Sequence, residues 1–317
     1  MYLIWRRLKM KIKEEAKFKL AIVGHGFVGR AVEFGFRHPA IKMMLIDPKY
    51  GNHIDDLVDF QPNLTFICVP TPMKENGKVD ATIAEDAILK VLHHTSGGVA
   101  LKSTVTPDII ERILNSISTE DKKYLNRFVY NPEFLTEKNA YDQFVNQPFM
   151  ILGGEAGACK ALENLYYDFS NVTCDKFITM SAIEASIAKY TINSFLALKV
   201  TFFNQIADAC SDFGVFYNSV MRGVLADPRI GISHTKVPGY DGKPGFGGAC
   251  LPKDTKAFTL STDSLTLLEE AIKINNRIRS NFELDDREKD NNVNYGKAKE
   301  EQQNRVNGSA EREQVLQ

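Results

Sequence analysis

Residues 18–29 read FKLAIVGHGFVG, so an apolar run leads directly into a glycine-rich turn. A continuous apolar run that ends at a glycine is typical of a strand buried in a parallel sheet, and the spacing after it predicts a helix over residues 30–37. Gly24, Gly26 and Gly29 form a GxGxxG pattern. Such glycines allow a tight turn and let the backbone approach a pyrophosphate at the helix N-terminus. The stretch therefore predicts a strand, a turn and a helix that bind a dinucleotide.

Asp47 supports this interpretation. It follows a second apolar run, residues 43–46, and lies about 20 residues beyond the glycines, the spacing at which a carboxylate holds ribose hydroxyls. A carboxylate there repels the 2′-phosphate of NADP, so NAD is the predicted cofactor. Phe27 and Val28, inside the turn, are expected to contact it, and His25 is interpreted as a tolerated loop residue.

Apolar runs continue to alternate with helical patterns in the first half of the chain. The runs are residues 64–69, 98–102, 127–130 and 149–152, and the helical patterns are residues 79–92 and 107–117. This alternation predicts βαβ units and an α/β fold of Rossmann type, with a doubly wound and mainly parallel sheet.

The pattern then changes to an all-α one. Residues 181–213 contain neither glycine nor proline, and their apolar side chains recur at helical spacing, which predicts one long amphipathic helix. A helix is expected over residues 219–225 and another over residues 254–279, with a Gly- and Pro-rich loop at residues 227–252 between them.

The patterns divide the chain into four segments. These are an N-terminal extension (1–17), a NAD-binding domain (18–178), a helical central domain (179–280) and a polar tail (281–317). The tail is rich in Asn, Gln, Glu and Lys, so it cannot bury enough apolar surface to offset its ordering entropy. We expect it to be solvated and disordered, with transient helix at residues 297–304.

Composition excludes several classes of partner. The 317 residues include 39 basic and 40 acidic side chains, so no excess charge favours nucleic acid or an anionic membrane. No apolar run approaches the ~20 residues that span a bilayer, and residues 1–8 lack the features of a signal peptide. The five cysteines are widely spaced without a CxxC pair. Neither a disulfide framework nor a metal site is expected, and a reducing cytoplasm fits best.

Cys250 has unusual neighbours. Residues 245–254 read GFGGACLPKD, and glycines let a backbone approach a ligand. Lys253 and Asp254 place a cation and a carboxylate close by, where they can favour a thiolate or activate water. On these residues alone, a nucleophile and a structural buried thiol are equally supported.

Five motifs, taken in order, resemble those of the nucleotide-sugar dehydrogenases that include UDP-glucose 6-dehydrogenase. They are VGHGFVG (23–29), VPTP (69–72), KSTV (102–105), NPEFL (131–135) and FGGACLPKD (246–254). The resemblance extends from about residue 18 to residue 279. Members of this family carry a C-terminal UDP-binding domain, and nothing after residue 280 has its pattern of strand followed by helix. The resemblance therefore implies a family member lacking that domain.

The resemblance implies roles for particular residues. Cys250 matches the catalytic thiol, and Lys189 and Asn193, four residues apart on one helix face, match the pair that stabilises its oxyanion. The other implied catalytic residues are Asp254, Glu133, Glu137 and Thr104. Implied at the cofactor are Thr71, Thr104, Glu137 and Lys253. Implied at the substrate are Glu133, Phe134, Leu135, Lys189, Asn193, Tyr240 and Gly247.

The implied reaction is the four-electron oxidation of UDP-glucose to UDP-glucuronate by a homodimer joined through the long central helix. The C6 alcohol would lose its proton through a water held by Thr104, Glu133 or Asp254. Cys250 would then form a thiohemiacetal and a thioester, which water activated by Glu137 or Asp254 would release. A covalent intermediate of this kind splits one difficult oxidation into easier steps.

Other functions stay open on the sequence. The substrate could be GDP-mannose or UDP-N-acetylmannosamine. The chain could also be a truncated NAD-binding subunit or relic without turnover, which the absence of the third domain favours. A hydroxyacid dehydrogenase of similar two-domain plan is a weaker rival, because it would not need Cys250.

Overall fold

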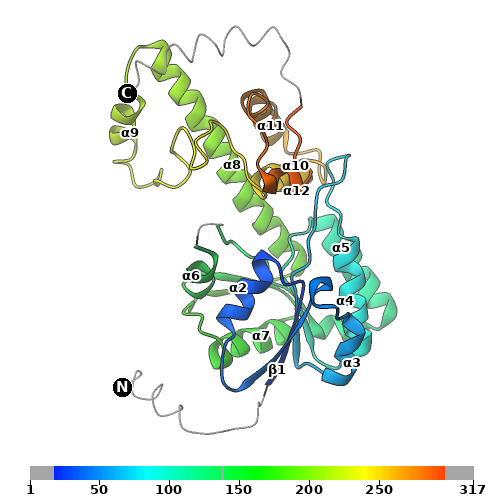
Figure 1. The fold of residues 1–317 in the computed structure, drawn as a ribbon. Coiled ribbons are helices and arrows are strands. Elements are labelled where there is room, and N and C mark those ends of the chain that lie inside the picture. Colours follow the sequence, from blue (N-terminus) through cyan, green and yellow to red (C-terminus); the bar gives the residue numbers. More distant parts are fainter. Residues whose placement is uncertain (1–17, 137–138, 297–317) are drawn as a thin grey trace, which may run out of the picture. The chain divides into compact units, whose positions relative to one another are not determined.

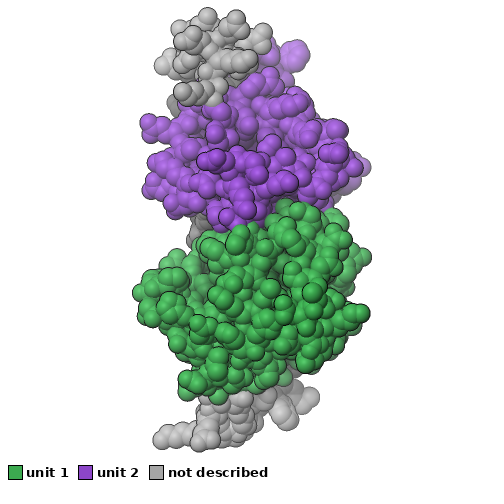
Figure 2. Space-filling model, turned by 90° about the vertical axis from the view of Figure 1, so that its right-hand side faces the viewer, with its two compact units in different colours: residues 1–71, 81–189 green, residues 72–80, 190–317 purple. Residues whose placement is uncertain are grey.

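The structure, a computed structural model, describes residues 18–136 and 139–296 (Figure 1). The chain divides into two compact units (Figure 2). Within the described residues, unit 1 comprises residues 18–71 and 81–189, and unit 2 comprises residues 72–80 and 190–296. The expected extension over residues 1–17 and the transient helix over residues 297–304 lie outside the described residues.

Unit 1 is built on a seven-stranded sheet of order β2-β1-β3-β4-β5-β6-β7. The strands are β1 (Phe18–Val23), β2 (Ile41–Ile46), β3 (Leu64–Ile67), β4 (Gly98–Leu101), β5 (Phe128–Tyr130), β6 (Met150–Gly154) and β7 (Phe177–Met180). All neighbours pair in parallel except β5 and β6, which pair antiparallel. The chain crosses from β2 over β1 to β3, which is the doubly wound order. The predicted Rossmann-type fold is confirmed.

Helices cover both faces of this sheet, with α2, α6 and α7 on one side and α3, α4 and α5 on the other (Figure 1). Their bounds are α2 (Phe27–Gly35), α3 (Leu57–Phe60), α4 (Thr82–His94), α5 (Pro107–Glu120), α6 (Ala140–Val145) and α7 (Ala156–Phe169), with short 3₁₀ turns η1 (Pro48–Tyr50), η2 (Ile54–Asp56) and η3 (Lys122–Arg127). The ring centre of Phe36, which follows α2, lies 5.3 Å from that of Phe66 and 5.1 Å from that of Tyr166. All three are buried, and so is every residue of β3, so both faces of that strand lose contact with water, as its continuous apolar run requires.

Helix α8 (Ala182–Asp212) is the long helix predicted over residues 181–213. Its first turns belong to unit 1, because the division falls between Lys189 and Tyr190 and not at the expected boundary after residue 178. Two contacts explain this. The Ser186 hydroxyl donates to the carbonyl of Val105 at 2.7 Å, and a β carbon on Gly153 would come within 2.6 Å of Ala185. The first turns of α8 therefore pack directly against the sheet.

Unit 2 contains the remainder of α8 with α9 (Tyr217–Val224), α10 (Leu251–Thr259), α11 (Thr266–Arg279) and α12 (Asp286–Asp290). The single helix predicted over residues 254–279 is interrupted at residues 260–265, which read LSTDSL. Short polar side chains compete for backbone hydrogen bonds in such a stretch. No helix among the described residues is long and apolar enough to cross a membrane.

The prediction of a solvated tail from residue 281 is wrong for its first part. Residues 281–296 belong to unit 2, and Asp285 caps α12 through a reciprocal capping box with Glu288. Glu288, Val293 and Tyr295 are buried. The composition argument failed here because a buried ion pair, rather than a broad apolar face, orders this segment.

Candidate active site

The glycine turn between β1 and α2 is sterically fixed at two positions. Gly24 has φ +86°, and a β carbon on it would lie 2.7 Å from the backbone of Cys68. A β carbon on Gly29 would lie 2.1 Å from the carbonyl oxygen of Gly24. A β carbon on Gly26 meets no atom within 4 Å, so the backbone there is open. This combination fits a pyrophosphate at the N-terminus of α2.

Asp47 lies at the carboxyl end of β2. Its carboxylate accepts hydrogen bonds from the backbone N–H of His25 at 2.7 Å and of Lys49 at 3.1 Å. Although partial burial raises its pKa, these two hydrogen bonds and the positive charge of Lys49 together lower the pKa of Asp47 below its ordinary value. The group is therefore an anion beside the turn, as the holding of ribose hydroxyls requires.

His25 is more than a tolerated loop residue. Its side chain is buried, with Nδ1 2.7 Å from the Tyr50 hydroxyl and Nε2 2.9 Å from the Glu33 carboxylate. The ring therefore ties the glycine turn to η1 and to α2. Sequence reasoning missed this role because the two partners are 25 and 8 residues away and their spacing carries no recognisable signal.

The loops after β3 and β4 are tied together at the carboxyl edge of the sheet. The Thr71 hydroxyl donates to the carbonyl of Thr104 at 2.9 Å, and the Ser103 hydroxyl donates to the carbonyl of Val69 at 2.7 Å. Ligands of open α/β sheets bind at this edge. The two loops that carry the predicted cofactor residues Thr71 and Thr104 therefore lie side by side.

Glu133 and Lys189 form a buried pair in unit 1. The Lys189 ammonium donates to the carbonyl of Glu133 at 2.5 Å, lies 3.5 Å from its carboxylate and stands 4.9 Å from the centre of the Phe134 ring. The same carboxylate accepts the backbone N–H of Leu135 at 2.5 Å. The predicted substrate residues of the NPEFL motif are thus gathered around one ammonium group. Glu137 lies outside the described residues.

Lys102, in the KSTV motif, was not assigned a role from sequence. It is buried, and its ammonium donates at 3.2 Å to the amide oxygen of Asn131, which also accepts the Tyr166 hydroxyl at 2.8 Å. Burial lowers the pKa of Lys102 to about 8, with Cys68 and Glu133 opposing the shift and Lys189 adding to it. Burial likewise raises the pKa of the Cys68 thiol to about 12. Cys68 is therefore not a candidate nucleophile.

Cys250 differs from the other four cysteines, which are buried, because it is exposed. It is the N-cap residue of α10, where the helix dipole favours a thiolate. One turn further on, Asp254 is almost fully buried and accepts from the Asn193 amide at 2.6 Å and from the Lys253 ammonium at 2.7 Å. Unit 2 therefore places an exposed thiol beside a buried polar triad that contains three of the predicted residues.

The predicted residues thus fall into two groups. Unit 1 holds the glycine turn with Phe27 and Val28, and also Asp47, Thr71, Thr104, Glu133, Phe134, Leu135 and Lys189; unit 2 holds Asn193, Tyr240, Gly247, Cys250, Lys253 and Asp254. Tyr240 and Gly247 lie in the loop that leads to Cys250, and the Tyr240 side chain is exposed.

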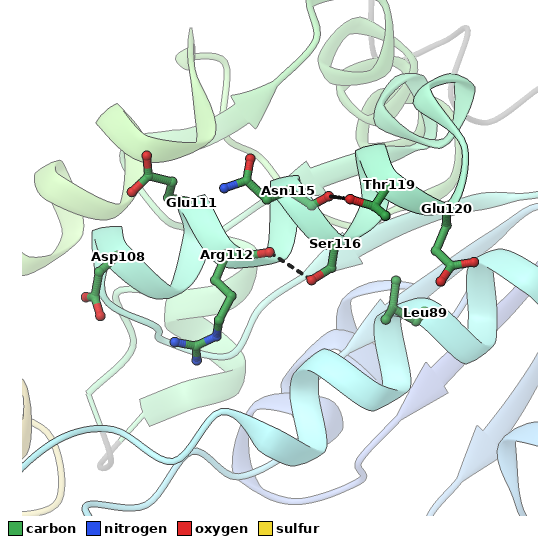
Figure 3. Close-up of a pocket in the computed structure, with 8 residues that line it drawn as sticks. All are labelled: Leu89, Asp108, Glu111, Arg112, Asn115, Ser116, Thr119 and Glu120. Carbon is green, nitrogen blue, oxygen red and sulfur yellow. Dashed lines mark hydrogen bonds between the residues drawn. The ribbon is translucent and has the colours of Figure 1, made fainter.

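A separate hollow lies between α4 and α5 of unit 1 (Figure 3). Its charged side chains include Arg112, which donates to Glu85 at 2.7 Å, and its hydroxyls on Ser116 and Thr119 donate back to helix carbonyls. None of the predicted site residues lines it. We therefore assign no role in the candidate site to this hollow.

A doubly wound sheet with a dinucleotide turn, followed by a helical unit that exposes a cysteine, defines a dehydrogenase-type architecture. Residues 58–170 match the NAD-binding domain of the UDP-glucose/GDP-mannose dehydrogenase family, and residues 183–277 match its central domain. The chain belongs to this family, and unit 1 contains its NAD-binding domain.

Individual relatives agree with the family match. UDP-glucose 6-dehydrogenase of Rickettsia felis is 32% identical over 223 residues, which cover 68% of this chain and 48% of the relative. The chain therefore spans about half the length of the curated relatives it matches. A UDP-glucose dehydrogenase from Pyrobaculum islandicum superposes with a TM-score of 0.70 at 25% identity, over 84% of this chain and 69% of that one. A UDP-D-ManNAc dehydrogenase from Pyrococcus horikoshii shares the fold (TM-score 0.67, 21% identity, 82% and 68% covered).

Replacing Gly26 separates a cofactor role from a structural one. Because the β carbon meets no atom within 4 Å, Gly26→Ala should fold like the wild type, with only the small loss of stability expected for alanine at an N-cap. The methyl group keeps a pyrophosphate away from the backbone, so the Kd for NAD should rise about tenfold, equivalent to about 1.4 kcal/mol. Calorimetric titration measures this. Gly157→Ala, at an equally open position in α7, is the control, and equal NAD affinities for the two variants would contradict the prediction.

Lys102 should make stability depend on pH. Its folded-state pKa of about 8 lies below the ordinary value of 10.5, so between these values the unfolded state binds more protons than the folded state. The contribution of Lys102 to the free energy of unfolding should therefore rise with pH over this range, by on the order of 3 kcal/mol. Urea unfolding of wild type and Lys102→Met measures it: the wild type should gain stability relative to the variant as the pH increases. If the unfolding free energies of the two proteins change in parallel with pH, the pKa of Lys102 is not lowered in the folded state.

Proposed function

We propose that the chain oxidises the C6 alcohol of a nucleotide sugar to the uronic acid, with UDP-glucose as substrate and UDP-glucuronate as product. The observation that carries the proposal is Cys250, which is exposed at the N-terminus of α10 and lies one turn from the Asn193–Asp254–Lys253 triad. Membership in the family and the relatives named UDP-glucose 6-dehydrogenase support the reaction and the choice of sugar.

In this proposal, Gly24, Gly26 and Gly29 admit the pyrophosphate of NAD to the backbone, and Asp47 holds the ribose hydroxyls. Bound NAD supplies a hydride acceptor for each of the two oxidation stages. The choice of NAD over NADP follows from the anionic Asp47, because a 2′-phosphate beside it would be repelled.

Cys250 performs the covalent chemistry. Its sulfur adds to the C6 aldehyde carbon while the carbonyl oxygen gains a proton, which yields a thiohemiacetal. Oxidation of this adduct leaves a thioester, and water then breaks the carbon–sulfur bond, so that the uronic acid leaves and the thiol is restored. The intermediate keeps the aldehyde bound between the two oxidations. Since the reaction needs a reduced thiol, we place the protein in the cytoplasm.

The remaining predicted residues supply proton transfer and charge stabilisation. We assign the oxyanion of the adduct to Lys189 and Asn193, neighbours at helical spacing on α8, and a donor of this kind typically contributes about 3 kcal/mol. Asp254, Glu133 and Thr104 are proposed to hold the waters that take up and deliver protons. Burial of the two carboxylates with Lys253 and Lys189 suits this role, because paired buried charges are pre-oriented.

Turnover tests the proposal directly. Protein, NAD and UDP-glucose should yield two NADH per sugar, followed by absorbance, and Cys250→Ala should lower kcat by at least about a hundredfold because the covalent stage is lost. Cys174→Ala, which removes a buried thiol, is the matched control and should retain turnover. NAD binding without turnover on UDP-glucose, GDP-mannose or UDP-N-acetylmannosamine would favour the non-catalytic alternative, and faster turnover on one of the latter two would reassign the substrate.

We also propose that the protein is a homodimer joined through α8. Three large apolar side chains on this helix, Ile187, Phe195 and Phe202, are 43%, 62% and 57% exposed. They recur at intervals of eight and seven residues, which places them along one stripe of the helix. An exposed apolar stripe of this kind favours a protein partner, and a second copy presents the same stripe.

A charge in this stripe should prevent association. Phe202→Glu should convert a dimer into a folded monomer, since the glutamate would have to lose its hydration in the interface. Light scattering after size-exclusion chromatography measures the mass. Val58→Glu, on α3 and exposed to a similar extent, should stay dimeric. A monomeric wild type, or a dimeric Phe202→Glu, would contradict the proposal.

A further inference from the structure

The segment after α11 contains a feature that the proposed function does not use. We call residues 285–295 the C-terminal strap; it begins with α12 and ends at Tyr295. The strap belongs to unit 2, and its Glu288 side chain is completely buried. A buried carboxylate is stable only when it is paired and hydrogen-bonded, so its partners identify what the strap does.

One oxygen of Glu288 collects three donors. It accepts from the Arg279 guanidinium at 2.8 Å, from the Tyr295 hydroxyl at 2.7 Å and from the backbone N–H of Gly248 at 3.1 Å. Its other oxygen accepts the backbone N–H of Asp285 at 2.9 Å. Arg279 is itself 1% exposed and also donates to Asp241 at 2.7 Å. The ion pair therefore joins α11 and the strap to the loop that precedes Cys250 at two points, Asp241 and Gly248.

The packing against this loop is close. A β carbon on Gly247 would lie 2.0 Å from the Arg279 guanidinium and 2.7 Å from the Glu288 carboxylate, so only glycine leaves room for the ion pair. Gly248, the next residue, has φ +79°, in the left-handed region. Glycine at position 247 is thus explained by the ion pair that packs against the backbone, and glycine at position 248 by its left-handed conformation.

The preceding residues of the loop are held in the same manner. The Asn275 side chain accepts from the backbone N–H of Phe246 at 2.7 Å and donates to its carbonyl at 3.0 Å. The Asn204 side chain accepts the backbone N–H of Gly245 at 2.9 Å. Side chains from α8, α11 and the strap therefore determine the backbone of residues 245–248, and Cys250 follows two residues later.

We infer that Glu288 is a positioning residue for Cys250: through Arg279 and the Gly248 amide, it fixes the loop that sets the thiol at the N-terminus of α10. This inference rests on the proposed function of Cys250 as the nucleophile. An ordinary packing contact would not require a fully buried charge on a glycine amide. Together with the buried side chains of Val293 and Tyr295, the arrangement also explains why a mostly polar segment is ordered on this unit.

The test follows the thiol itself and therefore does not depend on turnover. Alkylation of native protein by iodoacetamide, measured against pH with the modified peptide identified by mass spectrometry, reports Cys250, because the other four cysteines are buried. In Glu288→Asp the charge beside Arg279 is kept, but the carboxylate withdraws from the Gly248 amide. The midpoint of the alkylation profile should rise by about half a pH unit or more, since a loosened loop loses part of the helix N-terminal stabilisation.

Two further variants separate positioning from stability. Tyr295→Phe removes a donor to the same Glu288 oxygen but leaves the Arg279 and Gly248 contacts, so it should lower the melting temperature without moving the alkylation profile. Glu288→Gln removes the charge, so it should lower the melting temperature and also raise the midpoint of the alkylation profile. An alkylation profile that is unchanged in Glu288→Asp and in Glu288→Gln overturns the inference.

Turnover distinguishes the inference from the function on which it rests. In an active enzyme, Glu288→Asp should lower kcat about tenfold and leave the Kd for NAD unchanged. If the wild type shows no turnover on any nucleotide sugar while the alkylation profile still moves in Glu288→Asp, the proposed function fails, whereas the positioning of the thiol by Glu288 stands.

Discussion

The dinucleotide turn of unit 1 depends on a close approach between Gly29 on α2 and the carbonyl of Gly24 after β1, where a β carbon on Gly29 would lie only 2.1 Å from the carbonyl oxygen. The close approach packs the first turn of α2 against the end of β1, and it leaves the backbone of Gly26 open between them. Asp47 is then oriented by the same turn, because its carboxylate accepts the N–H of His25. The dinucleotide site is thus a consequence of steric exclusion first and of hydrogen bonding second.

In both units, buried charged side chains lie among the predicted site residues. In unit 1 the Glu133 carboxylate pairs with the Lys189 ammonium, and both charges influence the pKa of the buried Lys102. In unit 2 the Asp254 carboxylate accepts hydrogen bonds from Asn193 and Lys253. Replacing such groups by apolar ones often leaves stability unchanged or improves it, so their presence is poorly explained by folding alone. Perturbed and paired ionisable groups concentrate at functional sites. The distribution of buried charge in each unit is therefore consistent with catalysis.

The sequence predicted what depends on periodicity and on local sterics. The apolar run at residues 18–23, the glycine turn and the 31-residue helix α8 all correspond to observed elements. It missed features that depend on distant partners. The ring of His25 is held by Tyr50 and Glu33, and the strap is held by Arg279, and neither contact leaves a pattern in composition. Lys102 was passed over because burial, which lowers its pKa, is a property of the folded sheet.

Four of the five cysteine thiols are buried inside the units, whereas Cys250 is exposed to solvent. Among the cysteines, an oxidant such as peroxide would therefore act on one thiol only, and the sulfenic acid formed there would find the remaining cysteines buried. Because no second thiol of the same chain is accessible, the sulfenic acid of Cys250 cannot be protected by forming an intramolecular disulfide. Over-oxidation to the sulfinic acid then becomes the main route of damage to this thiol. Rescue would have to come from a small external thiol, so the redox state of the surroundings would determine how long this protein stays competent.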